Sequence, residues 1–174
     1  MESRGRVFSA IGVIFILIVG LYIGNIIPPI PLSLRDAGVY HGVIRTGDSY
    51  QVIAENKPFS VFDFFTRYIP VHLIPGEPVF VYSSVFAPAD FGTRIVHNWQ
   101  YYSTTTREWV SENSVEFGIV GGQDEGYRGY TLKANPRPGY WRVDVQTLTG
   151  ATIGRVTFKV IDVVQAPLLK TEYR

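Results

Sequence analysis

The last third of the chain alternates regularly between apolar and polar residues. In residues 138–160, "PGYWRVDVQTLTGATIGRVTFKV", every second position is apolar on both sides of a Thr-Gly pair. Side chains alternate across a strand, so this stretch predicts two half-buried strands joined by a turn at Gly150. Gly154 stands where the alternation slips by one position, which indicates a β-bulge. The residues expected in the core are Trp99, Trp141, Val143, Val145, Val156, Phe158 and Val160.

Strand patterns continue upstream to residue 39. Residues 39–55, "VYHGVIRTGDSYQVIAE", predict a hairpin that turns at Thr46–Asp48. Further strands are expected in "PVFVYSSVF", "RIVHNWQYY", "EWVSENSVEFGIV" and "YRGYTLK", which Gly and Pro residues separate. Short strands at regular spacing predict a mainly β fold, an Ig-like antiparallel β-sandwich.

The N-terminal pattern is different, because residues 7–27 carry no charge at all. A helix of that length is about 30 Å long, which matches the hydrocarbon core of a bilayer. A cleaved signal peptide is the alternative, but the stretch is long and lacks an A-x-A-like cleavage site. A retained single transmembrane helix is therefore expected. Arg4 and Arg6 precede it, which predicts a cytoplasmic N-terminus and a periplasmic C-terminal domain at a bacterial inner membrane.

Small residues gather on one side of this predicted helix. At about 100° per residue, they share roughly a third of the circumference, and two of them form a G-x-x-x-G. They are Ser9, Gly12, Gly20 and Gly24. This face is a candidate docking surface for another transmembrane helix, although glycine is also frequent in membrane helices in general.

A second, shorter helix is expected between the span and the sandwich. Residues 57–70, "KPFSVFDFFTRYIP", place Ser60 and Asp63 at capping-box spacing and end at Pro70. The apolar side of this amphipathic helix holds Phe59, Val61, Phe62, Phe64, Phe65, Tyr68 and Ile69. So short a helix needs a surface to lie on. The bilayer interface, a partner protein and the chain's own β-domain all remain open.

These patterns divide the chain into six segments. They are a cytoplasmic tail (1–6), a transmembrane helix (7–27), a Pro-rich linker (28–38), a membrane-proximal hairpin with the amphipathic helix (39–78), the β-sandwich (79–165) and a C-terminal tail (166–174).

Composition argues against several classes of function. Sixteen basic and fifteen acidic residues nearly cancel without a basic stripe, so no nucleic-acid partner is expected. The chain has no cysteine, and its three histidines show no metal-site spacing. His97 and Trp99 share a strand face and are interpreted as a structural pair. With no candidate nucleophile and base, the sequence predicts no enzyme, no metal and no cofactor.

Aromatic residues allow a binding role instead. Trp99 and Tyr101 share one face of their predicted strand, whereas Tyr102 lies on the other. Tyr101, Tyr102, Tyr127 and Tyr130 are candidates for exposed aromatics that contact a ligand or partner.

Residues 79–162 resemble the bacterial domain of unknown function numbered 2914. The resemblance rests on a His-x-Trp strand, an Arg-centred strand, P-G-x-W-x-V-x-V and a closing strand after a Gly turn. The matching positions are His97, Trp99, Arg128, Lys133, Pro138, Gly139, Trp141, Val143, Val145, Gly150, Ile153, Gly154, Phe158 and Val160. At Arg128 the chain has R-G-Y-T in place of R-T/S-x-S. The resemblance implies a small β-sandwich attached to membrane or envelope proteins and implies no chemistry.

Two functions fit these observations. The first is a non-catalytic single-pass accessory subunit of a larger membrane assembly, such as a respiratory or photosynthetic complex. Its partners would be the lipid bilayer and other integral membrane subunits. The second is a tethered periplasmic module that binds glycan or peptide through exposed aromatics.

Overall fold

A computed structural model describes residues 2–23, 32–47, 49–56, 68–87, 92–120 and 127–174. The chain divides into two compact units, Met1–Pro31 and Leu32–Arg174.

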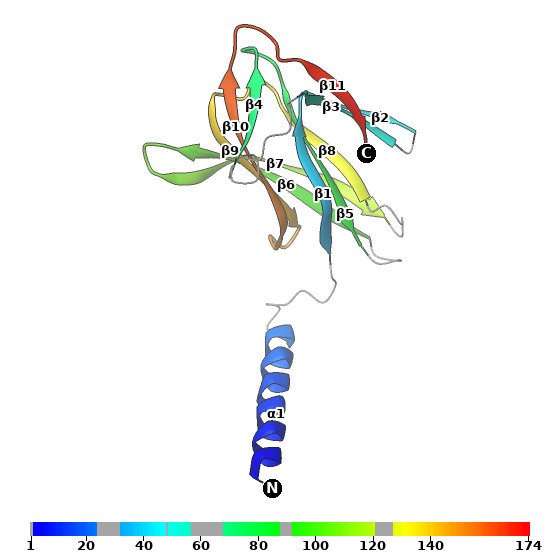
Figure 1. The fold of residues 1–174 in the computed structure, drawn as a ribbon, viewed down its shortest axis with the longest axis vertical. Helices are drawn as coiled ribbons and strands as arrows, with labels where there is room; N and C mark the ends of the chain where they lie inside the picture. Colours follow the sequence, from blue (N-terminus) through cyan, green and yellow to red (C-terminus); the bar gives the residue numbers. More distant parts are fainter. Residues whose placement is uncertain (1, 24–31, 48, 57–67, 88–91, 121–126) are drawn as a thin grey trace. The chain divides into compact units, whose positions relative to one another are not determined.

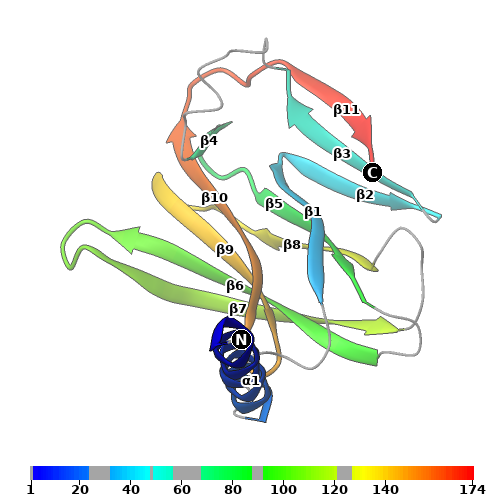
Figure 2. The ribbon, with the colours of Figure 1, turned by 60° about the horizontal axis from the view of Figure 1, so that its bottom comes forward.

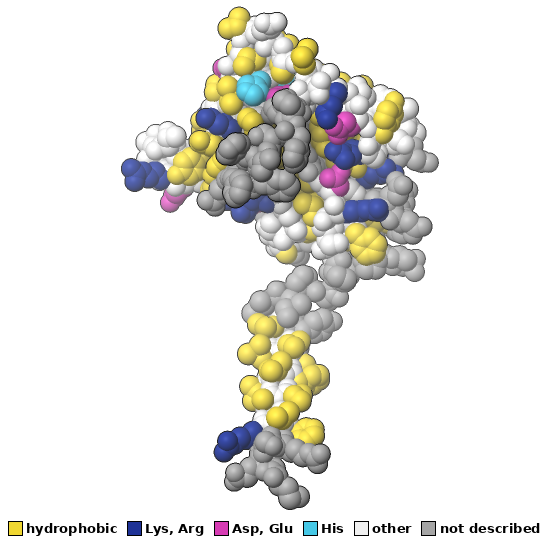
Figure 3. All heavy atoms as spheres, in the orientation of Figure 1, with side chains coloured by type: hydrophobic (Ala, Val, Ile, Leu, Met, Phe, Trp, Pro, Cys, Tyr) yellow, Lys and Arg dark blue, Asp and Glu magenta, His cyan; other side chains and the backbone are white. Residues whose placement is uncertain are grey.

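The N-terminal unit contains one described helix, α1 (Glu2–Ile23). Ten large apolar side chains between Val7 and Val19 are exposed, and they cover the visible side of the helix in Figure 3. In the part of the chain that the structure describes, no helix is both long and apolar enough to span a membrane.

The C-terminal unit is built from three β-sheets (Figures 1 and 2). One sheet has the order β1 (Ser33–Tyr40), β5 (Val79–Phe86), β8 (Tyr127–Lys133). The largest has the order β4 (Ile69–Leu73), β10 (Thr152–Asp162), β9 (Gly139–Thr147), β6 (Gly92–Ser103), β7 (Glu108–Val120). The third has the order β11 (Leu169–Tyr173), β3 (Ser49–Glu55), β2 (Gly42–Thr46).

The first two sheets form an Ig-like sandwich, which confirms the predicted mainly β fold. If β5, β6, β7, β8, β9 and β10 are taken as B, C, C′, E, F and G, their order follows the immunoglobulin arrangement. One pair departs from the predicted antiparallel pattern, because β4 runs parallel to β10 at the sheet edge.

The third sheet was not expected from the sequence. The predicted hairpin is present as β2 and β3, and it pairs with β11. Residues 169–173, expected in a C-terminal tail, are therefore a strand. Residues 33–38, expected in a linker, belong to β1 and pair with β5. The sandwich thus begins well before residue 79.

Strand β5 is buried on both faces. Val79, Val81 and Val85 pack toward the five-stranded sheet. On the other face, Tyr82 packs with residues of the third sheet, such as Tyr50. This middle position explains why residues 79–86 read as a nearly continuous apolar run.

The seven residues expected in the core are each at most 5% exposed. They lie between the first two sheets, with Trp99 packed edge-on against Phe158 at 6.2 Å between ring centroids. The expected bulge is present as a register shift between Thr152 and Gly154. A Cβ on Gly154 would meet the Leu34 side chain at 2.3 Å, so glycine lets β10 approach β1 closely.

Most of the predicted amphipathic helix lies outside the described residues, and this includes Phe59, Val61, Phe62, Phe64 and Phe65. Its predicted end is corrected. Ile69 and Pro70 belong to β4, because they pair with β10 rather than continuing a helix. Tyr68 packs its ring on Tyr140 at 4.7 Å.

His97 and Trp99 share one buried hydrogen-bond network. Trp99 Nε1 donates to Thr131 Oγ1 at 3.0 Å, and that hydroxyl lies 2.9 Å from His97 Nδ1. The opposite ring nitrogen, Nε2, lies 2.7 Å from Ser83 Oγ. A neutral ring supplies one donor and one acceptor, so one ring nitrogen donates to a hydroxyl and the other accepts from one. The network joins β6 to β5 and β8 across the core.

Phe158 tests how much the stability depends on this core. We expect Phe158→Ala to lower the free energy of unfolding by about 3–5 kcal/mol, because it removes a fully buried ring and leaves a cavity. Leu132→Ala is the matched control, since Leu132 is 47% exposed; its effect should stay within about 0.5 kcal/mol. Urea unfolding followed by tryptophan fluorescence measures both. Equal losses would contradict the assigned core.

His97 makes stability depend on pH. Burial lowers the pKa of His97 from 6.5 to about 4, so between these values the unfolded chain holds a proton that the folded chain does not. We expect stability to fall as pH drops from 6.5 to about 4, by roughly 3 kcal/mol in total. Urea unfolding across this range measures the loss.

The control for this effect is His97→Gln, which cannot titrate. This variant should be less stable at pH 7, because Ser83 and Thr131 lose their partner ring. Its stability should nevertheless change less between pH 6.5 and 4. The same pH slope in both proteins would rule out a buried neutral ring at this position.

Candidate functional site

The outer face of the five-stranded sheet carries chemistry that the core does not need. Residues that alternate with the core positions point away from Trp141 and Phe158. Cross-strand pairing brings Tyr140 beside Lys159, Arg142 beside Thr157, and Asp144 beside Arg155. The outer face is defined here as Tyr102, Gln100, Trp109, Tyr140, Arg142, Asp144, Arg155, Thr157 and Lys159.

A buried carboxylate organises the middle of the outer face. Asp144 is only 3% exposed and accepts two hydrogen bonds from Arg155, at 2.5 and 3.0 Å. Gln100 Nε2 lies 3.4 Å from Asp144, and Gln100 Oε1 accepts from Arg142 Nε at 2.6 Å. The hydrogen bond to Asp144 raises the pKa of Arg155. One carboxylate therefore neutralises one of two neighbouring guanidinium groups.

Two cations of the outer face rest on aromatic rings. The Arg142 guanidinium lies 4.6 Å from the centroid of Trp109, and Lys159 Nζ lies 5.2 Å from the centroid of Tyr140. Within the described residues, neither cation pairs with a carboxylate. Burial is the largest cause that lowers the pKa of Arg142. The outer face therefore has a positive charge that the described residues do not balance.

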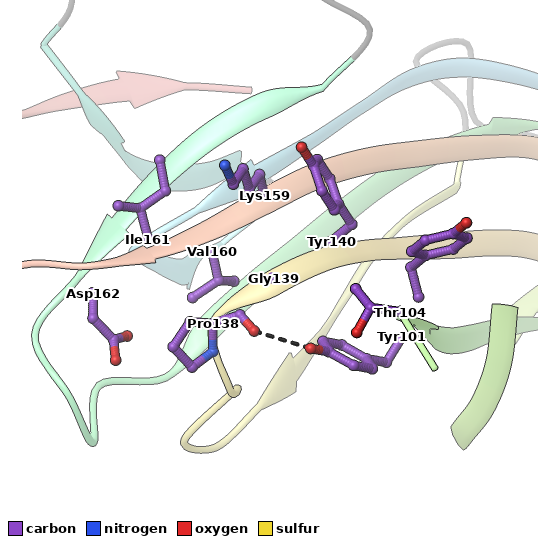
Figure 4. Close-up of a pocket in the computed structure, with 10 residues that line it drawn as sticks. Tyr101, Thr104, Pro138, Gly139, Tyr140, Lys159, Val160, Ile161 and Asp162 are labelled. Carbon is purple, nitrogen blue, oxygen red and sulfur yellow. Dashed lines mark hydrogen bonds between the residues drawn. The ribbon is translucent and has the colours of Figure 1, made fainter. Parts of the chain in front are cut away.

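A notch opens at the end of the outer face. Strand β6 pairs with β9 only as far as Tyr101, and the β6–β7 hairpin then continues alone. The hollow left there measures about 450 Å³, within the range of small-ligand sites. Its lining is Tyr101, Tyr102, Thr104, Pro138, Gly139, Tyr140, Lys159, Val160, Ile161 and Asp162 (Figure 4).

Backbone geometry keeps the floor of the notch open. Gly139 has φ of 131°, a conformation that favours glycine. A Cβ there would meet the Tyr101 hydroxyl at 2.7 Å. That hydroxyl donates to the Pro138 carbonyl at 3.1 Å, as Figure 4 shows. Arg137 covers the ring of Tyr101 at 4.0 Å and is paired with Glu112.

The four predicted surface aromatics have different positions. Tyr101 and Tyr102 are half-buried and line the notch. Tyr130 is 38% exposed and lies on the face of β8 that points away from the five-stranded sheet, near Tyr50. Tyr127 is only 7% exposed and packs in the core with Val145. A surface role for Tyr127 is therefore wrong, because residues three apart on a strand face opposite sides.

The sequence reasoning missed most of the outer face. It assigned no role to Arg142 or Lys159. The available signal was the alternation itself, since the polar positions of residues 138–160 are the ones that face outward. Alternation does not predict which strands are neighbours in the sheet, and it is the order of the strands that brings Trp109 of β7 close to Arg142 of β9.

Two histidines come together that no sequence spacing connects. Glu55, on β3, accepts a bond from the backbone N–H of His72 at 2.6 Å, and its carboxylate lies 3.0 Å from His72 Nδ1. Glu55 Oε1, the oxygen that accepts the backbone bond, also lies 3.2 Å from His41 Nε2. This cluster ties the third sheet to β4. Across the described ranges, no group of three such residues is arranged to hold a metal ion.

One pair has the geometry of a nucleophile and base but lacks access. Ser83 Oγ lies 2.7 Å from His97 Nε2, yet both residues are fully buried between the sheets. Burial also lowers the pKa of His97 to about 4, which makes it a weak base. The accessible chemistry at the outer face is instead stacking, cation contacts and hydroxyl bonding, which serve recognition.

The predicted docking face on α1 is only partly described. Gly12 and Gly20 lie in the helix with Ser9, and Gly24 lies outside the described residues. A Cβ added at Gly12 or Gly20 would meet nothing within 4 Å. The chain's own packing therefore does not require a glycine at either position.

Several solved structures are similar to the chain at low identity. The alkylpurine DNA glycosylase AlkC of Pseudomonas fluorescens bound to DNA matches 81% of this chain at 12% identity and a TM-score of 0.43. The chain spans only 33% of that protein. An immunoglobulin-like protein from Pseudomonas aeruginosa matches 75% of this chain at 12% identity and a TM-score of 0.36, and the match covers 96% of that protein. A β-glucosidase from Listeria innocua in complex with glucose matches 67% of this chain at 14% identity and a TM-score of 0.39. The match covers 17% of that protein.

These likenesses are too distant to bear on activity or ligand. No curated protein matches the chain.

A family model matches residues 92–160, which run from β6 to β10. This segment includes Trp99, Trp141 and Phe158 of the core together with most of the outer face. It lacks β1 and β5, which the rest of the chain supplies to complete the sandwich. Residues 92–160 match the model of the family described as "Protein of unknown function (DUF2914)".

Proposed function

We propose that this protein is a non-catalytic, single-pass accessory subunit of a larger bacterial membrane assembly. The tether is the uncharged stretch of residues 7–27, which extends beyond the last residue of α1, and the Ig-like sandwich is the extramembrane contact domain. The N-terminus lies in the cytoplasm and the sandwich in the periplasm, since Arg4 and Arg6 flank the uncharged stretch on one side.

The exposed apolar surface of α1 is the observation that carries this proposal. Every large apolar side chain from Val7 to Val19 is at least 37% exposed. Fourteen of the residues 7–27 are Val, Ile, Leu or Phe, each of which favours bilayer insertion by about 0.3–0.6 kcal/mol at a helix centre. These residues together favour insertion by several kcal/mol, whereas exposure of the same apolar surface to water is unfavourable.

The glycine face supports an assembly rather than a tether alone. Gly12 and Gly20 have open space where a side chain would be. Small residues on one side of a membrane helix let a second helix backbone approach closely. The neighbouring helix would belong to another integral membrane subunit.

The glycine face gives a direct test. Extraction in mild detergent followed by native electrophoresis should yield a large co-migrating complex. Gly20→Leu should move a substantial fraction of the protein to a smaller species, because the added side chain separates the two helices. The substitution has room within the chain's own fold.

The matched control is Ala10→Leu, which adds similar bulk about 100° away from the centre of the glycine face. It should leave the complex intact. A clean monomer from wild-type membranes would contradict the proposed assembly. If Gly20→Leu and Ala10→Leu behave alike, the glycine face is not the docking surface.

A further inference from the structure

We infer that the notch and the adjoining outer face bind an acidic glycan, a sugar chain that carries carboxylates. This inference goes beyond the proposed tethered scaffold, which needs no ligand. It rests on the shape of the notch, on two cations that have no carboxylate partner among the described residues and on the types of side chain around them.

The cations determine the charge of the ligand. Lys159 and Arg142 lie on neighbouring strands of one sheet face, and in the described part of the chain neither has a carboxylate partner. Arg142 donates instead to the neutral amide of Gln100 and lies near both the Asp144 carboxylate, which Arg155 already binds, and the Arg155 guanidinium itself. A partly buried cation in this setting gains most from a carboxylate on the ligand.

The aromatic rings determine the kind of surface the ligand must offer. Three tyrosines, Tyr101, Tyr102 and Tyr140, line the notch. Tyr140 and Lys159 lie side by side in Figure 4, so one ligand can contact a ring and a cation together. The apolar faces of sugar rings pack on such side chains while the hydroxyls stay hydrogen-bonded.

Two polar side chains favour a glycan over an acidic peptide. Asp162 is exposed at the end of the notch, and Thr104 borders it with a hydroxyl. An ionised acidic side chain offers the Asp162 carboxylate no hydrogen-bond donor, whereas an acidic sugar carries hydroxyl donors beside its own carboxylate. A chain of acidic sugars satisfies Asp162 and Lys159 at once.

Isothermal titration of the full-length protein in detergent micelles tests the inference. The acidic probe is hexagalacturonate, with maltohexaose as the neutral glycan and hexaglutamate as the acidic peptide. We expect saturable binding of hexagalacturonate only, and weaker binding as salt rises. Lys159→Gln and Tyr140→Ala should each reduce the affinity at least about tenfold.

The control for charge is Arg94→Gln. Arg94 is an exposed arginine that forms an ion pair with Glu116. It lies on β6 of the same sheet, near the end of the strand that is far from the notch. Its loss should leave the affinity within about twofold. Lys159 has no ion pair with the described residues and contacts only the ring of Tyr140 among the aromatic side chains described, so Lys159→Gln should unfold close to the temperature of the wild type.

Each contrary result overturns a specific part of the inference. Equal binding of maltohexaose removes the role of charge, and equal binding of hexaglutamate assigns the surface to acidic peptides. Binding that survives Lys159→Gln and Tyr140→Ala moves the site elsewhere. Absence of saturable binding to hexagalacturonate rejects the inference while leaving the membrane tether and the assembly untouched.

Discussion

Removal of apolar side chains from water is the constraint on which this structure depends. The sandwich buries its apolar side chains within its own fold, whereas the N-terminal helix does not. In the sandwich, alternate residues of β6, β9 and β10 bury their side chains against β5 and β8. In α1, the apolar side chains remain exposed. At about 25 cal/mol per Å² of apolar surface, that exposure is a strong drive toward a non-aqueous surrounding. The proposed membrane tether follows from this difference.

The same alternation that builds the core also creates the outer face. Once Trp141, Val143 and Val145 point inward, the residues between them must point outward. The pairing of β9 with β10 and β6 then places Arg142 and Lys159 near aromatic rings. A core requirement on one side of the sheet thereby fixes the geometry of a recognition surface on the other.

Much of the fold could be predicted from local pattern. Alternation in residues 138–160 gave the hairpin, the bulge at Gly154 and the core positions, because each depends on neighbours in sequence. The third sheet could not be predicted, since β11 pairs with β3 more than a hundred residues away. Such pairing leaves no local signal. β4 was hidden for another reason: Ile69 fitted a helical apolar arc, and its parallel partner β10 comes late in the chain.

The candidate site was less predictable than the fold. Tyr101 and Tyr102 were proposed from composition, and both line the notch. The notch itself exists because β6 leaves β9 after Tyr101 and because Gly139 has a conformation that leaves its floor open. The cluster of Glu55 with His41 and His72 likewise arises from tertiary contacts between elements that share no motif.

The central proposal is that residues 7–27 cross a membrane and leave the sandwich on the far side. The chain has no cysteine, so single cysteines report position without a background. Ser3→Cys marks the N-terminus, and Thr105→Cys marks the exposed turn between β6 and β7. In bacterial spheroplasts, a membrane-impermeant maleimide should label Thr105→Cys at once and Ser3→Cys only after lysis. Labelling of Thr105→Cys only after lysis would contradict the account.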